Sequence, residues 1–205
     1  PLWAERPIDL QLALNAASAY CAQGELPGAS IPRIAQALRG SVEGDVLVHR
    51  WLERSLTISG TGRCKGLTDD TVQHFVDAAS ANPTLHALPG RRQDLESLQG
   101  RLALRRGDAA AAARWFDRAL LEEPRPGVAA MHAAILASAN QYDLAIAHLD
   151  RFAALPPQAA DLTGMPRVHA WVLSRQAYWP DRLAELRKAI VAERDKTSAT
   201  ARERH

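Results

Sequence analysis

The chain of 205 residues lacks any long uninterrupted run of apolar residues and any large excess of charge of one sign. A transmembrane helix needs about 20 consecutive, mainly apolar residues, so no segment of this sequence is predicted to cross a membrane. The 25 basic and 23 acidic side chains leave a formal charge of only +2. Because so small a charge supplies no strong field for a nucleic acid or an anionic membrane, we expect no nucleic-acid partner.

Cysteine and lysine are also scarce. Cys21 and Cys64 form no CxxC pair and have no histidine at metal-ligand spacing, which argues against a zinc site or a redox motif. The sequence leaves open whether these two cysteines form a disulfide or remain free thiols. Arginine supplies nearly all of the positive charge, and together with the many alanines this bias is typical of a GC-rich bacterial genome.

The first residues, PLWAERP, contain no Met and none of the basic or apolar segments of a signal peptide. We interpret this start as that of a processed protein or of a fragment of a longer one. If a preceding segment carried a signal or membrane helices, the chain would lie in the periplasm or at a membrane, where the cysteines could pair. The chain would then be associated with the membrane only through that preceding segment. The alternative is the cytoplasm.

Motifs of the common enzyme classes are missing as well. The sequence has no GxSxG nucleophile, phosphate-binding loop, dinucleotide fingerprint or HExxH zinc motif. Its seven histidines are dispersed, so we expect them to be exposed or hydrogen-bonded structural residues. The segment SGTGRCKG at 59–66 lacks the spacing of a phosphate loop and is expected to be a flexible loop. We therefore predict no catalytic residue, cofactor or metal, and the chain as given is not expected to be an enzyme.

Apolar residues recur at spacings of three and four along almost the whole chain, whereas alternating β-branched residues are rare. This periodicity predicts an all-α protein. Thr68 is expected to cap a helix whose first turn carries Asp69 and Asp70. Helices are predicted at 8–23, 31–38, 42–58, 68–80, 92–106, 109–122, 127–139, 142–154, 167–178 and 180–193.

Two segments correspond when the sequence is shifted by 33 residues: GDAAAAARWFDRALLEEP at 107–124 and NQYDLAIAHLDRFAALPP at 140–157. Turn-forming, small, large apolar and proline positions fall in register. A period near 33 residues with two helices in each unit indicates a helical solenoid. The matched pairs are Gly107 with Asn140, Ala112 with Ala145, Phe116 with Leu149, Leu120 with Ala153, and Pro124 with Pro157.

On these residues the segment Gln93 to Pro126 resembles a tetratricopeptide repeat (TPR). The matching positions are Gly100, Ala103, Gly107, Ala112, Phe116, Ala119 and Pro124. The resemblance implies a right-handed superhelix of antiparallel helix pairs, and a generic array of α-hairpins is the alternative. We expect a single repeat domain over 1–195, with divergent helices at 1–90, TPR-like repeats at 93–157 and a terminal helical pair at 165–194. Residues 196–205 are expected to be a disordered tail.

The resemblance also implies a partner-binding face on the first helix of the repeat, made by Asp94, Ser97, Arg101, Leu104 and Arg105. Arg101 and Arg105 lie one turn apart and could hold a carboxylate or a phosphate. Ordinary solvated charges near a helix end are the alternative for these two residues. We expect a noncatalytic module that binds or scaffolds a protein or peptide partner, as the C-terminal region of a bacterial envelope or membrane protein. The alternative is an accessory domain of a membrane glycosyltransferase or polysaccharide polymerase whose catalytic part is not in this chain.

Overall fold

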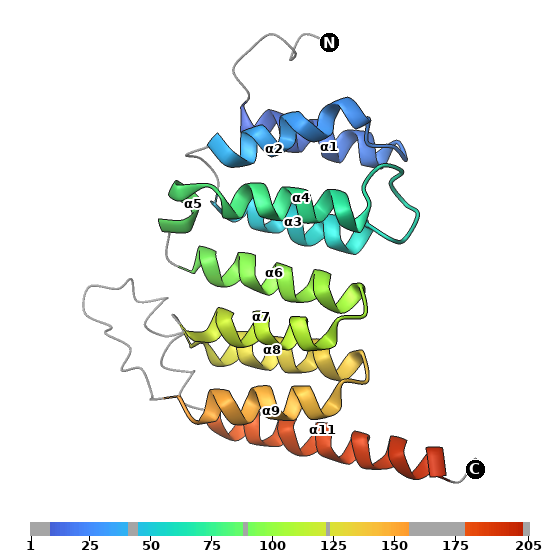
Figure 1. The fold of residues 1–205 in the computed structure, drawn as a ribbon, viewed down its shortest axis with the longest axis vertical. Coiled ribbons are helices and arrows are strands. Elements are labelled where there is room, and N and C mark those ends of the chain that lie inside the picture. The colour runs from blue at the N-terminus through green and yellow to red at the C-terminus, as the bar shows by residue number, and fades with distance from the viewer. Residues whose placement is uncertain (1–8, 41–44, 88–89, 122–123, 156–178, 203–205) are drawn as a thin grey trace. The chain divides into compact units, whose positions relative to one another are not determined.

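The computed structural model describes residues 9–40, 45–87, 90–121, 124–155 and 179–202. All the regular secondary structure in these ranges is helical (Figure 1). The all-α fold class predicted from the spacing of apolar residues is therefore confirmed. Over the same ranges, no helix is both long enough and apolar enough to cross a membrane.

The chain forms two compact units, Pro1–Leu102 and Ala103–His205. The division falls within the segment 93–126 that resembles a repeat, so the last turn of one helix, α6, belongs to the second unit. The elements described in the first unit are α1 (Leu10–Ala22), the 3-10 turn η2 (Gly28–Ser30), α2 (Ile31–Gly40), α3 (Asp45–Ile58), α4 (Asp69–Ser80), α5 (Pro83–Ala87) and most of α6 (Arg91–Arg105).

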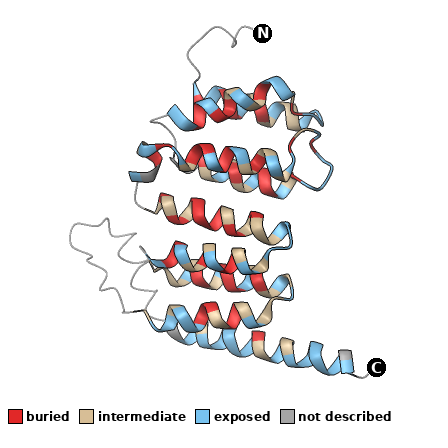
Figure 2. Ribbon diagram, viewed as in Figure 1, coloured by how far each residue is buried: buried red, intermediate tan, exposed pale blue. Residues whose placement is uncertain are grey.

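The core of the first unit is built from the apolar stripes of its helices, which Figure 2 shows as buried along their facing sides. Phe75 on α4 and Leu52 on α3 are completely buried. Trp51, the neighbour of Leu52, is partly buried, and its ring centroid lies 5.5 Å from that of Phe75. Burying one such side chain stabilises the fold by about 1.5–3 kcal/mol, so this contact between α3 and α4 is a main source of stability.

The start of α4 follows the sequence prediction. Thr68 has extended backbone geometry, and its hydroxyl oxygen accepts a hydrogen bond from the backbone N–H of Thr71 at 3.2 Å. Asp69 and Asp70 lie in the first turn, where the positive end of the helix dipole favours carboxylates. The predicted cap is therefore confirmed, and the helix begins and ends as its pattern indicates.

The short helix α5 was not predicted, because Asn82-Pro83 reads as a simple chain break. Asn82 is buried, and its side-chain oxygen accepts hydrogen bonds from the backbone N–H groups of Thr84 at 3.0 Å and Leu85 at 3.3 Å. Its side-chain nitrogen donates to the carbonyl of Leu38, at 2.7 Å. Since proline is well tolerated in the first turn of a helix, Asn82 and Pro83 start a new helix instead of ending the structure.

Among the described residues of the second unit there are four further helices, all connected by packing. In this unit α8 contacts both α7 and α9, and α11 contacts both α8 and α9. Buried apolar side chains from all four helices form one core. The helix bounds are Ala109–Leu121 for α7, Pro126–Ser138 for α8, Tyr142–Ala153 for α9 and Trp179–Arg202 for α11.

Two turns 33 residues apart have the same backbone geometry. Gly107, before α7, has φ of 83°, and Asn140, before α9, has φ of 60°. In both turns the next residue's N–H donates to the carbonyl five residues earlier, at 3.0 Å after Gly107 and 2.9 Å after Asn140. This is the hydrogen bond of a Schellman helix end, which needs a left-handed residue. Asn140 is the one non-glycine residue in the described ranges with positive φ, so the predicted equivalence of the two turn residues is confirmed.

The residues that follow these turns repeat in part. Ala112 and Ala145, five positions after the turn residues, are both completely buried, as expected for small contact residues. Phe116 and Leu149, four positions further on, are also buried. The correspondence fails at the next pair, because Leu120 is buried while Ala153 is exposed. Pro157 and the predicted helix at 167–178 lie outside the described residues.

The expectation of a disordered tail from residue 196 is wrong for residues 196–202, which continue α11 to Arg202. The hydroxyl of Thr197 donates to the carbonyl of Glu193 at 2.9 Å, and that of Thr200 donates to the carbonyl of Lys196 at 3.0 Å. Threonine side chains often disfavour a helix, but here each hydroxyl has a hydrogen-bond partner within the helix. The charged and polar composition of residues 196–202 therefore predicted a frayed tail, whereas the structure continues α11 there.

His132 and His148, in the described part of the second unit, are both buried. The ring of His132 stacks on that of Phe116, with centroids 4.2 Å apart, and His148 lies within 2.7 Å of a carboxylate oxygen of Asp117 through its Nδ1 atom. The other oxygen of Asp117 pairs with Arg151 at 2.7 Å. These contacts explain the two residues as parts of the core, in line with the structural role expected for the histidines.

Candidate functional site

A disulfide fixes the loop that borders the candidate site. Cys21, near the end of α1, is bonded to Cys64 in the loop 59–66, and their Cα atoms are 4.9 Å apart. Of the two states that the sequence leaves open for these cysteines, the structure has the disulfide. The bond closes a sequence separation of 43 residues, so it joins the first helix to the segment that follows α3.

The same loop is also held by its backbone. Leu26 donates its N–H to the carbonyl of Lys65 at 2.7 Å, and Lys65 donates its own N–H to the carbonyl of Gly24 at 2.8 Å. At the end of the loop, the carbonyl of Gly66 accepts a hydrogen bond from the hydroxyl of Thr71 at 3.0 Å. The loop is therefore fastened at several points, whereas its glycine content had suggested a flexible segment.

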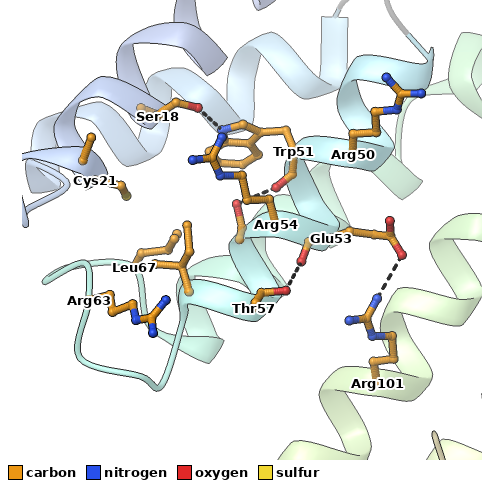
Figure 3. A pocket seen from close by; sticks show the side chains of 14 residues that line it. Ser18, Cys21, Arg50, Trp51, Glu53, Arg54, Thr57, Arg63, Leu67 and Arg101 are labelled. Carbon is orange, nitrogen blue, oxygen red and sulfur yellow. Dashed lines mark hydrogen bonds and ion pairs between the residues drawn. The ribbon is translucent and has the colours of Figure 1, made fainter.

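A groove with a volume of about 660 Å³ lies within the first unit (Figure 3). One helix, α3, supplies half of its lining. The rest comes from α1, from Arg63 in the loop 59–66 (the disulfide loop), from Leu67 just after this loop and from Arg101 on α6. A space of this size is typical of sites for small molecules or short peptide segments. The lining residues are Ala17, Ser18, Cys21, Ala22, Arg50, Trp51, Glu53, Arg54, Ser55, Thr57, Ile58, Arg63, Leu67 and Arg101.

Trp51 links two walls of this groove. Its indole N–H donates to the hydroxyl of Ser18 on α1 at 3.1 Å, while its ring packs against Phe75 in the core. Both contacts hold the indole in one orientation, so α1 and α3 keep a fixed spacing. The indole is therefore already positioned by the core, which lowers the entropic cost of packing a ligand against it.

Glu53 is the one acidic residue among those that line the groove. Its carboxylate accepts a hydrogen bond from the guanidinium of Arg101 at 3.0 Å, and its second oxygen lies 3.6 Å from the Nε2 atom of His49. These contacts occupy Glu53 and offset the charge of Arg101. They also attach α6 to α3 on one side of the groove.

Three other arginines line the groove with no acidic partner among the described residues. They are Arg50 and Arg54 on α3 and Arg63 in the disulfide loop, and all three are exposed. Figure 3 shows their side chains around the groove, with only Glu53 bearing the opposite charge. The groove is therefore strongly basic, although the chain as a whole is close to neutral.

The structure brings one of the five residues predicted from the repeat pattern into this groove, namely Arg101. Asp94 instead pairs with Arg91 at 2.8 Å. Ser97 is buried, and its hydroxyl donates to the carbonyl of Gln93 at 2.7 Å. A buried hydroxyl that is already bonded offers no surface to a partner.

The remaining two predicted residues lie in the second unit. Leu104 packs against the core of that unit, and Arg105 is exposed at the end of α6. Arg101 is engaged with Glu53, so the predicted pair of arginines is not a pair of free cations. The sequence pattern located α6 correctly but did not predict which of its side chains border a cavity.

Sequence reasoning missed Arg50, Arg54, Arg63 and Trp51. The spacing of Arg50 and Arg54 gave no distinct signal, because Arg101 with Arg105 and Arg114 with Arg118 are also one helical turn apart. What the sequence could not supply was the disulfide, which brings Arg63 to the same groove as α3.

Within the described ranges, no group of three or more His, Cys, Asp or Glu residues is arranged to hold a metal ion. Comparison of the chain with protein-family models, with curated proteins and with solved structures finds no match.

Proposed function

We propose that this chain is a noncatalytic, TPR-like module that binds another protein, and that the groove between α1, α3 and the disulfide loop is its binding site. The observation that carries the proposal is this groove of about 660 Å³, lined by three arginines that have no acidic partner in the part of the chain that the structure describes. Its size suits a few residues of an extended peptide. Trp51, at the wall of the groove, is held by its contacts with Ser18 and Phe75.

The TPR-like part of the proposal draws support from the second unit. The turns at Gly107 and Asn140 share their left-handed geometry and hydrogen bond, and Ala112 and Ala145 are buried at equivalent positions. The packing of α8 against both α7 and α9 is what stacked helical hairpins require. A right-handed superhelix of such pairs is the arrangement that we propose for the chain.

The disulfide supports an oxidising compartment as the place of action. Disulfides persist in the periplasm and outside the cell and are rare in the bacterial cytoplasm. We therefore propose that the module works at the cell envelope, as part of a larger envelope or membrane protein. An accessory role beside a membrane glycosyltransferase or polysaccharide polymerase would use the same groove, with a subunit or segment of that enzyme as its partner.

Photo-crosslinking tests the proposal at matched positions. Thr57 lines the groove, and Thr197 lies on α11 in the other unit; both are exposed, and both donate their hydroxyl to the carbonyl four residues earlier. A benzoylphenylalanine at position 57 should crosslink a protein in source cells, while one at position 197 should not. The crosslinked protein, once purified, should bind the chain in a calorimetric titration.

Two outcomes would count against the proposed function. Equal crosslinking from positions 57 and 197 would indicate random encounters and not a binding site. Crosslinks only to glycan or lipid, with no protein product at position 57, would remove the protein partner from the proposal.

A further inference from the structure

We infer that the groove recognises an acidic peptide segment, with Arg50, Arg54 and Arg63 binding carboxylates of the partner. This inference rests on the proposed function, since it specifies the chemistry of the protein partner. It starts from the imbalance of charge in the groove: four arginines and one acidic residue line it, and that one acid already contacts Arg101.

The arginines are placed for more than one carboxylate. Arg50 and Arg54 project from successive turns of α3, which are about 5.4 Å apart along the helix axis, and Arg63 comes from the loop on the opposite border (Figure 3). A guanidinium binds a carboxylate through two parallel hydrogen bonds. Three such groups on two elements match acidic side chains spaced along a chain better than they match a single small anion.

The rest of the lining indicates a peptide. Ala17, Ala22, Ile58 and Leu67 give the groove apolar walls between the arginines, and Trp51 adds an aromatic surface. Apolar residues between the acids of a partner could pack there. A nucleic acid would need a continuous basic track, whereas the unpartnered arginines of this groove are confined to one helix and one loop.

The disulfide makes the site dependent on oxidation. Arg63 precedes Cys64, so the bond to Cys21 fixes the backbone next to this arginine. The loop also contributes to the groove wall through Arg63 itself. Reduction should therefore weaken acidic binding by removing one of three cationic contacts, while Arg50 and Arg54 stay in place on α3.

The test uses a fluorescein-labelled, end-capped peptide of eight residues in which Glu alternates with Leu and Ala, and the same peptide with Gln in place of Glu. Fluorescence anisotropy in 50 mM NaCl should show the Glu peptide binding at least tenfold more tightly than the Gln peptide. Arg54→Glu and Arg63→Glu should each weaken Glu-peptide binding at least tenfold. Arg114→Glu is the matched control, because Arg114 is an exposed arginine on α7, outside the groove, and it should leave binding unchanged.

Three further measurements complete the test. Circular dichroism must show that every variant retains its helical signal. Dithiothreitol should weaken binding of the Glu peptide to the parent chain several-fold. It should leave the binding of this peptide to a Cys21→Ser, Cys64→Ser variant unchanged. Inorganic phosphate at 10 mM should compete weakly, because a single anion engages only part of the site.

Equal binding of the Glu and Gln peptides would overturn the inference. It would also be overturned if Arg114→Glu weakened binding of the Glu peptide as much as Arg54→Glu and Arg63→Glu do. So would a galacturonate oligomer that binds in an arginine-dependent way more tightly than the Glu peptide, since the ligand would then be an acidic glycan. If position 57 crosslinks a protein whose binding survives Arg54→Glu and Arg63→Glu, the proposed function stands and only the acidic specificity fails.

Discussion

Gly66 faces the backbone carbonyl of Leu26 so closely that a β-carbon on residue 66 would collide with the carbonyl oxygen. The two residues lie on either side of the short backbone pairing between the disulfide loop and the turn after α1, where Leu26 donates its N–H to Lys65. Gly66 also has φ of 84°, a left-handed conformation that side chains disfavour. The fastening of the loop therefore depends on glycine at this position for two separate reasons.

Gly66→Ala should accordingly destabilise the first unit more than Gly62→Ala. Both residues have positive φ, but a β-carbon at Gly62 would meet nothing within 4 Å. The left-handed conformation alone costs an alanine about 1–2 kcal/mol, which is the loss expected at Gly62. The clash at Gly66 should add about 1–3 kcal/mol. Urea unfolding followed by circular dichroism measures both, and equal losses would show that the carbonyl moves aside freely.

Removing the disulfide should lower stability without abolishing the helices. The double variant Cys21→Ser, Cys64→Ser should lose about 2–4 kcal/mol of unfolding free energy, because the bond restricts a long loop in the unfolded chain. The parent chain in dithiothreitol should show the same loss. If the reductant destabilised the double variant as well, its effect would not come from this bond.

Asn82→Ala should destabilise the first unit by about 1–3 kcal/mol, since it leaves the buried carbonyl of Leu38 and the first N–H groups of α5 without their partner. Asn15→Ala is the control, because Asn15 is an exposed asparagine whose side chain accepts a hydrogen bond from Gln11 on the same helix. That change should be nearly neutral. Thermal unfolding of the two variants measures their losses of stability. Equal losses in Asn82→Ala and Asn15→Ala would contradict the role of Asn82.

The ion pair between Asp150 on α9 and Arg187 on α11 should give the second unit a small dependence on acid. The guanidinium of Arg187 donates two hydrogen bonds, at 2.6 and 3.0 Å, which lower the pKa of Asp150 below its ordinary value. A lowered carboxyl pKa stabilises the fold above the unfolded pKa of about 4, and this stabilisation is lost as the pH falls through the folded value.

Asp150→Asn should therefore remove part of the loss of stability on acidification while changing stability little at neutral pH, because both side chains are largely exposed. Unfolding curves between pH 2 and pH 7 measure this. Raising the salt concentration should reduce the difference between the two proteins. A variant that follows the parent curve at every pH would show that the pair has no net effect.

Local signals in the sequence were sufficient for most of the helices. Thr68 with two following acids fixed the start of α4, and the alignment of Gly107 with Asn140 found two turns with the same geometry. These features depend on residues near each other in the chain. The continuation of α11 to Arg202 was missed because its threonines bond backward within the helix, an interaction that composition does not reveal.

The candidate site was less accessible to prediction because it depends on residues distant in the sequence. Arg101 was selected as a free cation, but its partner, Glu53, lies 48 residues away in the sequence. The position of Arg63 depends on the bond of Cys64 to Cys21 and on the backbone pairing of Lys65 with Gly24 and Leu26. Periodicity gives the face on which a side chain lies, but not the side chains from other elements that it meets.

The bond between Cys21 and Cys64 also determines how this chain would respond to mechanical tension. If the two ends were pulled apart, the covalent cross-link would carry the load across a span of 43 residues. The intervening segment, including α2 and α3, would then be shielded from stretching. A single-molecule extension trace of the oxidised chain should be shorter than that of the reduced chain by about 150 Å, the extended length of that segment.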